Sequence, residues 1–399
     1  MFWIFLKMET HMAIASWGRS YYPCGKKTSQ KRKEIMKNIA IVIGTRPELI
    51  KMAPVMHELM KRKIPFSFIH SNQHYSKELD GNIIRNLDLP SIDEHLDVGS
   101  GLHGAQTGKI MESIERLWTK HTPHIAIVHG DTNTTLGAAL AAAKMHIPVC
   151  HVEAGLRSFD NAMPEEINRI LTDRISDVLF TPTETSKEYL LKEGVDPEKI
   201  VVTGNTVVDA LLQHIEIARK KSAVLRTYTL EKNHYACVTM HRPENVDSKK
   251  QLEKGIELLV VLSKELGYRL VFPIHPRTQQ ALEKWQIHVP AQYITVIPPV
   301  DYLDTLILLE NAVLVITDSG GIQEEAYMLK RPLITIRTST ERPETLSANV
   351  IVGLDKKKAI AAWRAYKKGW GKWGNELGDG HAAEKIVDVL ERMVKKGKR

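Results

Sequence analysis

Short apolar stretches alternate with longer amphipathic stretches along most of the chain. This alternation is typical of parallel β-strands joined by helices, because strands that are buried on both faces are apolar along their whole length. The apolar stretches form two series. The strands predicted in the first series are 38–43, 65–70, 125–129, 149–152, 178–181 and 201–203, and those in the second are 235–240, 269–274, 294–297, 314–317, 333–336 and 349–352. We therefore predict an α/β fold with two doubly wound, Rossmann-like sheets.

The two series predict two domains, because a chain of 399 residues is long for a single hydrophobic core. We expect the boundary near 204–209, with an N-terminal domain over 36–205 and a C-terminal domain over 206–380. A final helix is predicted over 381–395, since its apolar residues share one side. We expect this helix to pack back on the N-terminal domain and the active site to lie in a cleft between the domains.

The first 35 residues show no sustained periodicity. Their apolar start is short, and Lys7 and Glu9 interrupt it, which does not match a secretory signal. We predict that residues 1–35 are a disordered arm or a translated upstream region, and that Met36 is the functional start.

The charge is concentrated at the two ends of the chain. The net charge is +8, of which residues 1–35 carry +5 and the four basic residues among the last five carry +4, so the rest is close to neutral. Nucleic-acid binding is not expected, because it requires a broad basic face. The three cysteines lie far apart in sequence, which fits a reducing compartment such as the cytoplasm. The chain has no apolar run long enough for a membrane span.

In sheets of this type, ligands bind at the carboxyl ends of the strands, so polar clusters directly after strands are candidates for a site. The first cluster is GTRPELIK, residues 44–51. Its glycine and early proline indicate that the strand is followed by a turn and the N-terminus of a helix. Free backbone amides at such an N-terminus attract an anion. Arg46 and Lys51 can add positive charge for a diphosphate. An ordinary strand-to-helix turn with two surface cations is the alternative.

Two further clusters follow strands of the first series. Asp131 lies in VHGDTNTT, where its carboxylate can point into the crevice or cap the next helix. Glu153 ends an apolar strand, where an unpaired charge is costly unless it serves a site, and Arg157 is its expected counter-ion. In MPEEINR, Glu165 lies in the first turn of a helix, so capping is again an alternative.

The second series carries basic and imidazole groups. His241 and Arg242, in TMHRPEN, can offer an acid and a cation to a leaving phosphate. His275, after another strand, adds a hydrogen-bonding group on the same rim.

The most specific cluster is TDSGGIQEEA, residues 317–326. Ser319, Gly320 and Gly321 open a helix whose bare amides can hold a pyrophosphate. Glu325 lies about one turn deeper, where its carboxylate can accept both ribose hydroxyls. TERPET, residues 340–345, is a candidate loop that closes on the ligand.

In order and spacing, these clusters, together with GDGHAAEKI at 378–386, resemble the non-hydrolysing UDP-N-acetylglucosamine (UDP-GlcNAc) 2-epimerase family. The resemblance extends from Lys37 to the final helix. It implies the GT-B fold, UDP held mainly by the second domain, no NAD or metal cofactor, a homodimer, and a role in supplying sugars for cell-surface polysaccharides. It further implies roles for eleven residues: Asp131, Glu153, Glu165 and His241 in catalysis, and Arg46, Lys51, Arg169, Ser319, Gly320, Gly321 and Glu325 in substrate binding. With His275, which its position after a strand suggests for substrate binding, there are twelve predicted site residues.

The chemistry of C2 inversion agrees with the family's mechanism. The C2 proton of UDP-GlcNAc is not acidic, because no carbonyl lies beside it, and the sequence offers no electron sink. Anti elimination of UDP to a 2-acetamidoglucal, followed by syn return of UDP to give UDP-N-acetylmannosamine (UDP-ManNAc), uses the bond from C1 to oxygen as the sink. That route needs acids and bases on both faces of C2 and firm retention of UDP.

The resemblance leaves alternatives open. Family members that are activated by a second UDP-GlcNAc carry a Gln-His-Arg type segment, whereas this chain has Gln73, His74, Tyr75 and Ser76, which puts such activation in question. A 2-epimerase of UDP-2,3-diacetamido-2,3-dideoxyglucuronic acid is the nearest alternative. A GT-B glycosyltransferase, a hydrolysing epimerase and a non-catalytic UDP-sugar sensor are more distant ones.

Overall fold

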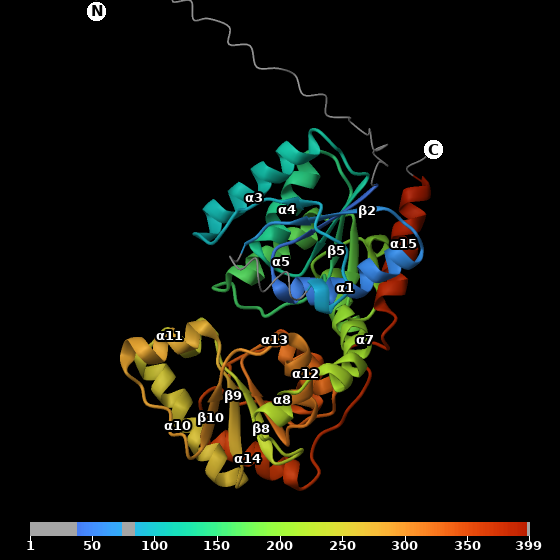
Figure 1. Ribbon diagram of the computed structural model, residues 1–399. Coiled ribbons are helices and arrows are strands. Elements are labelled where there is room, and N and C mark those ends of the chain that lie inside the picture. Colours follow the sequence, from blue (N-terminus) through green and yellow to red (C-terminus); the bar gives the residue numbers. More distant parts are fainter. Residues whose placement is uncertain (1–37, 74–83, 397–399) are drawn as a thin grey trace, which may run out of the picture. The chain divides into compact units, whose positions relative to one another are not determined.

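The computed structural model describes residues 38–73 and 84–396, so the predictions for residues 1–35 and for His74, Tyr75 and Ser76 lie outside the described residues. The described residues group into one compact unit. It contains two parallel sheets flanked by helices (Figure 1).

The first sheet has seven parallel strands in the order β3-β2-β1-β4-β5-β6-β7. The strands are β1 Ile39–Ile43, β2 Phe66–His70, β3 Glu94–His95, β4 Ile125–His129, β5 Val149–Val152, β6 Val178–Thr181 and β7 Ile200–Val202. All six predicted strands are present within one residue at each end. Only β3 is additional; it has two exposed polar residues and pairs at the edge with β2.

The second sheet repeats this topology with six parallel strands in the order β10-β9-β8-β11-β12-β13. Its strands are β8 Tyr235–Thr239, β9 Arg269–Pro273, β10 Ile294–Ile297, β11 Leu314–Thr317, β12 Leu333–Thr335 and β13 Asn349–Ile351. In both sheets the strand order reverses beside the first strand, between β1 and β4 and between β8 and β11. Such a reversal opens a crevice at the carboxyl ends of the strands.

Alternating residues of β1 fill two separate cores. Ile39, Ile41 and Ile43 pack against α1 Arg46–Lys61 and α15 Ala382–Lys396, whereas Ala40 and Val42 face α3 His103–Trp118 and α4 Asn133–Lys144. This part also contains α5 Pro164–Ile175, α6 Glu184–Lys192 and the 3-10 helix η1 Pro197–Lys199. The sheet is therefore buried on both faces, as its apolar strands predict.

The strand β8 divides the second core in the same way. Ala236 and Val238 pack on the side of α10 Lys249–Leu266 and α14 Lys356–Lys367, and Cys237 packs on the side of α7 Thr206–Lys221 and α12 Tyr302–Glu310. The other helices here are α8 Val224–Thr227, α9 Pro243–Val246, α11 Pro276–Trp285, α13 Gly320–Met328 and the 3-10 helix η2 Pro343–Ser347.

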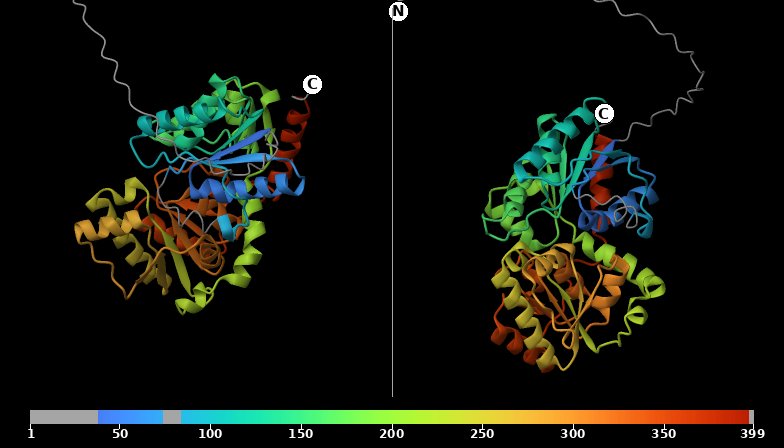
Figure 2. Two further views of the ribbon diagram at one scale, coloured as in Figure 1. Left: turned by 45° about the horizontal axis from the view of Figure 1, so that its top comes forward. Right: turned by 60° about the vertical axis from the view of Figure 1, so that its left-hand side comes forward.

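The final helix α15 lies beside α1 in all three views (Figures 1 and 2). Its start is fixed by α7, because the buried Asp209 carboxylate accepts hydrogen bonds from the amides of Ala382 at 3.2 Å and Ala383 at 2.8 Å. Within residues 38–73 and 84–396, no helix has the length and apolar character needed to cross a membrane.

Candidate functional site

Four buried charged side chains form a closed ring at the end of β5. The Glu153 carboxylate binds Lys51 Nζ through Oε1 at 2.7 Å and Arg342 Nη2 through the same oxygen at 2.7 Å. The Glu324 carboxylate, on α13, approaches the same two cations, with Lys51 Nζ at 3.2 Å and Arg342 Nε at 2.8 Å. Cations and carboxylates therefore alternate around what we call the charge ring, which consists of Lys51, Glu153, Arg342 and Glu324.

The backbone of Glu153 adopts an unusual conformation. Its φ is +68°, in the left-handed region that residues with a side chain seldom occupy. Such strain persists only where surrounding contacts enforce it and is frequent at functional sites. The expected counter-ion was wrong: Arg157 pairs instead with Asp173 at 2.8 Å and with Glu193 at 2.7 Å.

The charge ring shifts the pKa values of its members. Burial opposes ionisation of Glu153, but Lys51 and Arg342 hold its pKa well below the ordinary value. Burial likewise opposes the charge on Lys51, yet Glu153 and Glu324 raise its pKa. For Glu324, burial dominates and raises the pKa despite the two cations. Glu153 is thus a fixed negative charge.

His129, at the end of β4, faces the same carboxylate. Its Nε2 atom lies 3.3 Å from Oε2 of Glu153. Burial lowers the pKa of His129 to about 4, because its effect outweighs the opposite effect of Glu153. The imidazole of His129 is therefore neutral at pH 7. This histidine is not among the predicted site residues, although it directly precedes the Gly130-Asp131 pair.

Asp131 does not cap α4. Thr132 is the N-cap, because its side chain accepts a hydrogen bond from the Thr135 amide. The Asp131 carboxylate instead binds Nη2 of Arg169 at 2.5 Å and is partly exposed. The structure therefore joins two of the predicted site residues in one ion pair.

The two glutamates at the start of α5 have different partners. Glu166 is buried and accepts hydrogen bonds from the amides of Ser158 at 2.9 Å and Phe159 at 3.0 Å, and it binds Arg169 at 2.7 Å. Glu165 is partly exposed, and its nearest cation is Nη1 of Arg242 at 3.8 Å. The start of α5 has no capping hydrogen bond from a side chain, so neither glutamate caps this helix, and Glu166 instead holds the loop before it.

Glu48 is a further buried carboxyl group and is not among the predicted site residues. Its oxygens accept hydrogen bonds from the Gly44 amide at 2.9 Å and from the hydroxyls of Thr45 at 2.8 Å, Thr132 at 3.0 Å and Thr135 at 3.2 Å. Burial raises its pKa to about 7, against the effect of these donors. Glu48 fastens the turn before α1 to the turn before α4.

In the second sheet, the fully buried Asp318 shapes the loop after β8. Its carboxylate accepts hydrogen bonds from the amides of His241 and Arg242, both at 2.9 Å, and from Asn245 Nδ2 at 3.0 Å. The His241 ring stacks on that of His275, with 5.1 Å between centroids.

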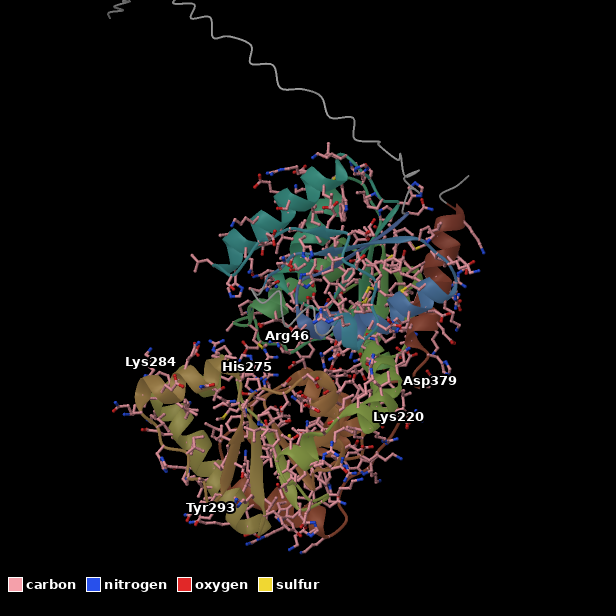
Figure 3. All side chains as sticks on the ribbon, in the orientation of Figure 1. Arg46, Lys220, His275, Lys284, Tyr293 and Asp379 are labelled. Atoms are coloured by element: carbon pink, nitrogen blue, oxygen red, sulfur yellow. The ribbon has the colours of Figure 1, made fainter. Side chains whose placement is uncertain are left out.

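Burial lowers the pKa of both histidines, for His275 to about 4. His275 also caps α11 by accepting from the Arg277 amide, and the charge of Arg46 contributes to its lowered pKa. Both His275 and Arg46 are labelled in Figure 3.

The start of α13 has the features expected of an anion site. Ser319 is the N-cap but makes no capping hydrogen bond through its side chain. A Cβ at Gly320 would lie 2.6 Å from Oε1 of Glu341, whereas a Cβ at Gly321 would meet no atom within 4 Å. A side chain at Gly320 would therefore have to displace the Glu341 carboxylate, whereas Gly321 leaves open space beside the backbone.

Glu325 is buried on α13. Burial and the neighbouring Glu324 raise its pKa to about 8, against smaller effects of Lys51 and the Tyr302 hydroxyl. The group is therefore mostly protonated at pH 7.

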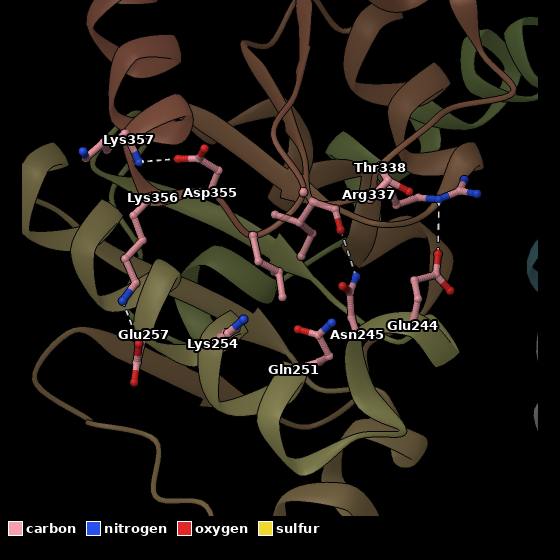
Figure 4. A pocket seen from close by; sticks show the side chains of 13 residues that line it. Glu244, Asn245, Gln251, Lys254, Glu257, Arg337, Thr338, Asp355, Lys356 and Lys357 are labelled. Carbon is pink, nitrogen blue, oxygen red and sulfur yellow. Dashed lines mark hydrogen bonds and ion pairs between the residues drawn. The ribbon is translucent and has the colours of Figure 1, made fainter.

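A cavity of about 570 Å³ lies elsewhere, between α10 and the turns after β12 and β13 (Figure 4). None of the twelve predicted site residues lines it. An ion pair from Lys356 to Glu257 at 2.6 Å and one from Arg337 to Glu244 at 3.4 Å lie on its wall. Among the described residues, no group of three or more His, Cys, Asp or Glu side chains is arranged to hold a metal ion.

The chain is similar to proteins of known activity. The sequence model described as UDP-N-acetylglucosamine 2-epimerase matches residues 57–391. A UDP-N-acetylglucosamine 2-epimerase of Methanocaldococcus jannaschii is 45% identical over 88% of this chain and 98% of its own length. The enzyme of that name from Escherichia coli K12 is 34% identical over 88% of this chain and 98% of its own length. A UDP-2,3-diacetamido-2,3-dideoxy-D-glucuronate 2-epimerase of Pseudomonas aeruginosa is 36% identical over 89% of this chain and 99% of its own length.

Solved structures give the same picture. The M. jannaschii UDP-GlcNAc 2-epimerase in complex with UDP-GlcNAc and UDP superposes with a TM-score of 0.84, covering 89% of this chain and 99% of that one at 45% identity. The wall teichoic acid polymerase TagF shares only the fold, with a TM-score of 0.51 at 13% identity. Together with the strand orders, these neighbours confirm the predicted GT-B fold with two Rossmann-like sheets.

Proposed function

The chain belongs to the UDP-N-acetylglucosamine 2-epimerase family, and we propose that it interconverts UDP-GlcNAc and UDP-ManNAc. The observation that carries this proposal is Glu153, a buried carboxylate held ionised at the end of β5 by two cations. A fixed buried charge of this kind costs free energy, and active sites are where such groups are concentrated. The relative bound to UDP-GlcNAc and UDP supports the choice of substrate.

The proposed reaction proceeds through elimination and re-addition. A base removes the C2 proton while the bond from C1 to the UDP oxygen breaks, which leaves a double bond between C1 and C2 and free UDP in the site. The UDP oxygen then returns to C1 while an acid protonates C2 from the other face. Electrons and atoms balance without an oxidant.

We assign catalytic roles to the carboxylates of Asp131, Glu153 and Glu165, with His241 beside the departing UDP. The ion pair between Asp131 and Arg169 and the nearness of Glu165 to Arg242 support a shared site. A partly exposed Glu165 can exchange protons with solvent, whereas Glu153 serves as a fixed charge.

We assign UDP to the second sheet. The amides at Ser319, Gly320 and Gly321 suit the pyrophosphate, with Arg46 and His275 nearby, and Glu325 suits the ribose. The residues 36–205 and 206–380 are proposed as the two domains of this site, and a homodimer stays a prediction from the family resemblance.

Incubation with UDP-GlcNAc and no acceptor tests the proposal. Formation of UDP-ManNAc is expected, and in deuterated water the product should carry deuterium at C2. Free UDP with ManNAc would indicate a hydrolysing enzyme, binding without product would indicate a sensor or transferase, and retention of the C2 hydrogen would overturn elimination.

The diacetamido-glucuronate sugar is the second candidate substrate, because a 2-epimerase of that sugar is 36% identical to this chain. The same assay with that sugar separates the two. We expect the larger kcat/KM with UDP-GlcNAc, since the relatives named for it reach 45% identity.

A further inference from the structure

Glu324 has no role in the function proposed above, yet it is fully buried in the site. Its Oε1 atom lies 2.8 Å from Arg342 Nε and accepts from Asn205 Nδ2 at 2.6 Å, while Oε2 lies 3.2 Å from Lys51 Nζ. Burying an ionisable side chain completely is costly unless its partners compensate. Here the partners are two cations that also hold Glu153.

The charge ring gives Glu324 a specific effect on Glu153. With both carboxylates present, two positive and two negative groups alternate, and each cation is held from two sides. Without the Glu324 charge, Lys51 and Arg342 would share one carboxylate in a buried site, where like charges repel strongly. Both cations would then be free to shift, and Glu153 would lose its fixed orientation.

Glu324 also links the two halves of the proposed site. It follows Gly320 and Gly321 by one turn of α13 and directly precedes Glu325, so the helix assigned to UDP carries it. Its partner Asn205 caps α7 through the Val207 amide. The position of α13 is therefore tied to Lys51, on α1, and to Arg342, before η2.

We propose that Glu324 is a positioning residue for epimerisation, which holds Lys51 and Arg342 against Glu153 and thereby aligns that carboxylate with the UDP-sugar. The inference rests on the proposed function. Glu324 acts through its neighbours and need not touch the substrate.

The proposal has a consequence for pH dependence. The charged groups that face Lys51 are Glu153 at the end of β5, Glu324 on α13 and Arg342, and Lys51 also acts on the pKa of His129 and Glu325. Of these, Glu153 and Glu324 favour the charged ammonium, and burial and Arg342 oppose it. Loss of the Glu324 charge should therefore lower the pKa of Lys51.

The experiment compares Glu324→Gln with Glu324→Asp and the wild type. Glu324→Gln should lower kcat by roughly tenfold or more, as expected for a misaligned catalytic group, with UDP affinity within a few-fold. The high-pH limb of kcat should move to lower pH by roughly one unit or more, the size of shift that an adjacent opposite charge produces. Glu324→Asp keeps the charge and should restore the position of this limb at least in part.

Asp209→Asn is the matched control, since Asp209 is a buried carboxylate that caps α15 and makes no contact with the charge ring. It should lose thermal stability to a similar degree but keep the wild-type pH profile. If Glu324→Gln folds but behaves like this control, Glu324 is a structural residue and the inference is overturned. The inference is likewise overturned if Glu324→Gln does not fold and Glu324→Asp moves the high-pH limb by a full unit although it keeps the charge.

Activity of the wild type on UDP-GlcNAc is measured first, so that the two proposals fail separately. If the wild type is inactive on that sugar, the proposed substrate is wrong, and the same variants are compared on the diacetamido-glucuronate sugar. Inactivity on both sugars would overturn the inference as well, because it would leave no epimerisation for Glu324 to support.

Discussion

Glu153 and Glu325 are equally buried, with 7% of each residue exposed, yet the pKa of Glu153 is lowered and that of Glu325 is raised to about 8. Glu153 ends a strand of the first sheet and meets two cations within 2.7 Å. Glu325 lies on α13, beside the second sheet, where its neighbour Glu324 forms the ion pairs with Lys51 and Arg342. Burial alone therefore does not decide the charge of a carboxyl group; the arrangement of cations does.

The difference suggests a division of labour between two similar scaffolds. The same strand order supports a fixed negative charge in the first sheet and a neutral hydrogen-bonding group in the second. The first suits stabilisation of charge around C2, and the second can ionise when the hydroxyls of a ribose donate hydrogen bonds to it. Four predictions test this division.

The largest effect is expected for the carboxylates of the first sheet. Glu153→Gln, Asp131→Asn and Glu165→Gln keep the shape but remove the charge, so turnover should fall by about 100-fold or more, as for other positioned acids and bases. UDP affinity, measured by calorimetry, should stay within a few-fold. Normal turnover, or a parallel loss of UDP binding, would show that these residues are structural.

The second prediction concerns Glu325. Glu325→Ala should weaken UDP binding by about 1–3 kcal/mol, the cost of losing a strong acceptor, while the turnover at saturating substrate changes less. Because the pKa of free Glu325 is about 8, UDP binding that ionises the group should release a proton near pH 7. Calorimetry in buffers of different ionisation enthalpy measures this release, and Glu325→Gln, which has no proton to release, is the control.

The third prediction uses stability in the absence of ligand. The folded-state pKa of Glu153 lies below its ordinary value of 4.5, so its ion pairs stabilise the protein above pH 4.5, and this stabilisation is lost as the pH falls further. Glu325 behaves oppositely: between pH 4.5 and about 8 the folded protein keeps a proton that the unfolded chain has released, so stability falls as the pH rises.

Denaturant unfolding between these pH values should separate the two variants. Relative to the wild type, Glu325→Gln should gain on the order of 1 kcal/mol or more from pH 4.5 to pH 8, since one pKa unit corresponds to about 1.4 kcal/mol. Glu153→Gln should be less stable than the wild type at pH 7, and the gap should narrow in acid. Parallel curves for both variants would contradict the opposite charge states.

The sequence predicted the fold well because apolar runs mark buried parallel strands directly. It missed β3, because a strand of two polar residues, Glu94 and His95, has no periodicity to detect. The positions of the motifs could be predicted as well, because the motifs come directly after the predicted strands.

Ion-pair partners were harder to predict than positions. Arg157, the expected counter-ion, lies four residues from Glu153, but the actual partners are 102 and 189 residues away in sequence. Which side chains meet depends on strand order and on the loops after the strands, and neither follows from local pattern. A signal for Glu324 and Glu48 did exist, since both acids lie inside the clusters already selected.

The smallest effect is expected for a charged pair of the second sheet that is exposed. Arg277 binds Asp247 through Nε at 2.9 Å, but the two side chains are 45% and 52% exposed. Water and salt screen such a pair, so Asp247→Asn should change the free energy of unfolding by less than about 0.5 kcal/mol, within the range measured for exposed ion pairs. Turnover should stay within a factor of about two, because the Arg277 side chain contacts no member of the charge ring and an exposed ion pair contributes little. Parallel measurements at low and high salt provide the control. A large loss, insensitive to salt, would mean that charge in this second-sheet loop matters as much as in the charge ring, and the contrast between exposed and buried charge would fail.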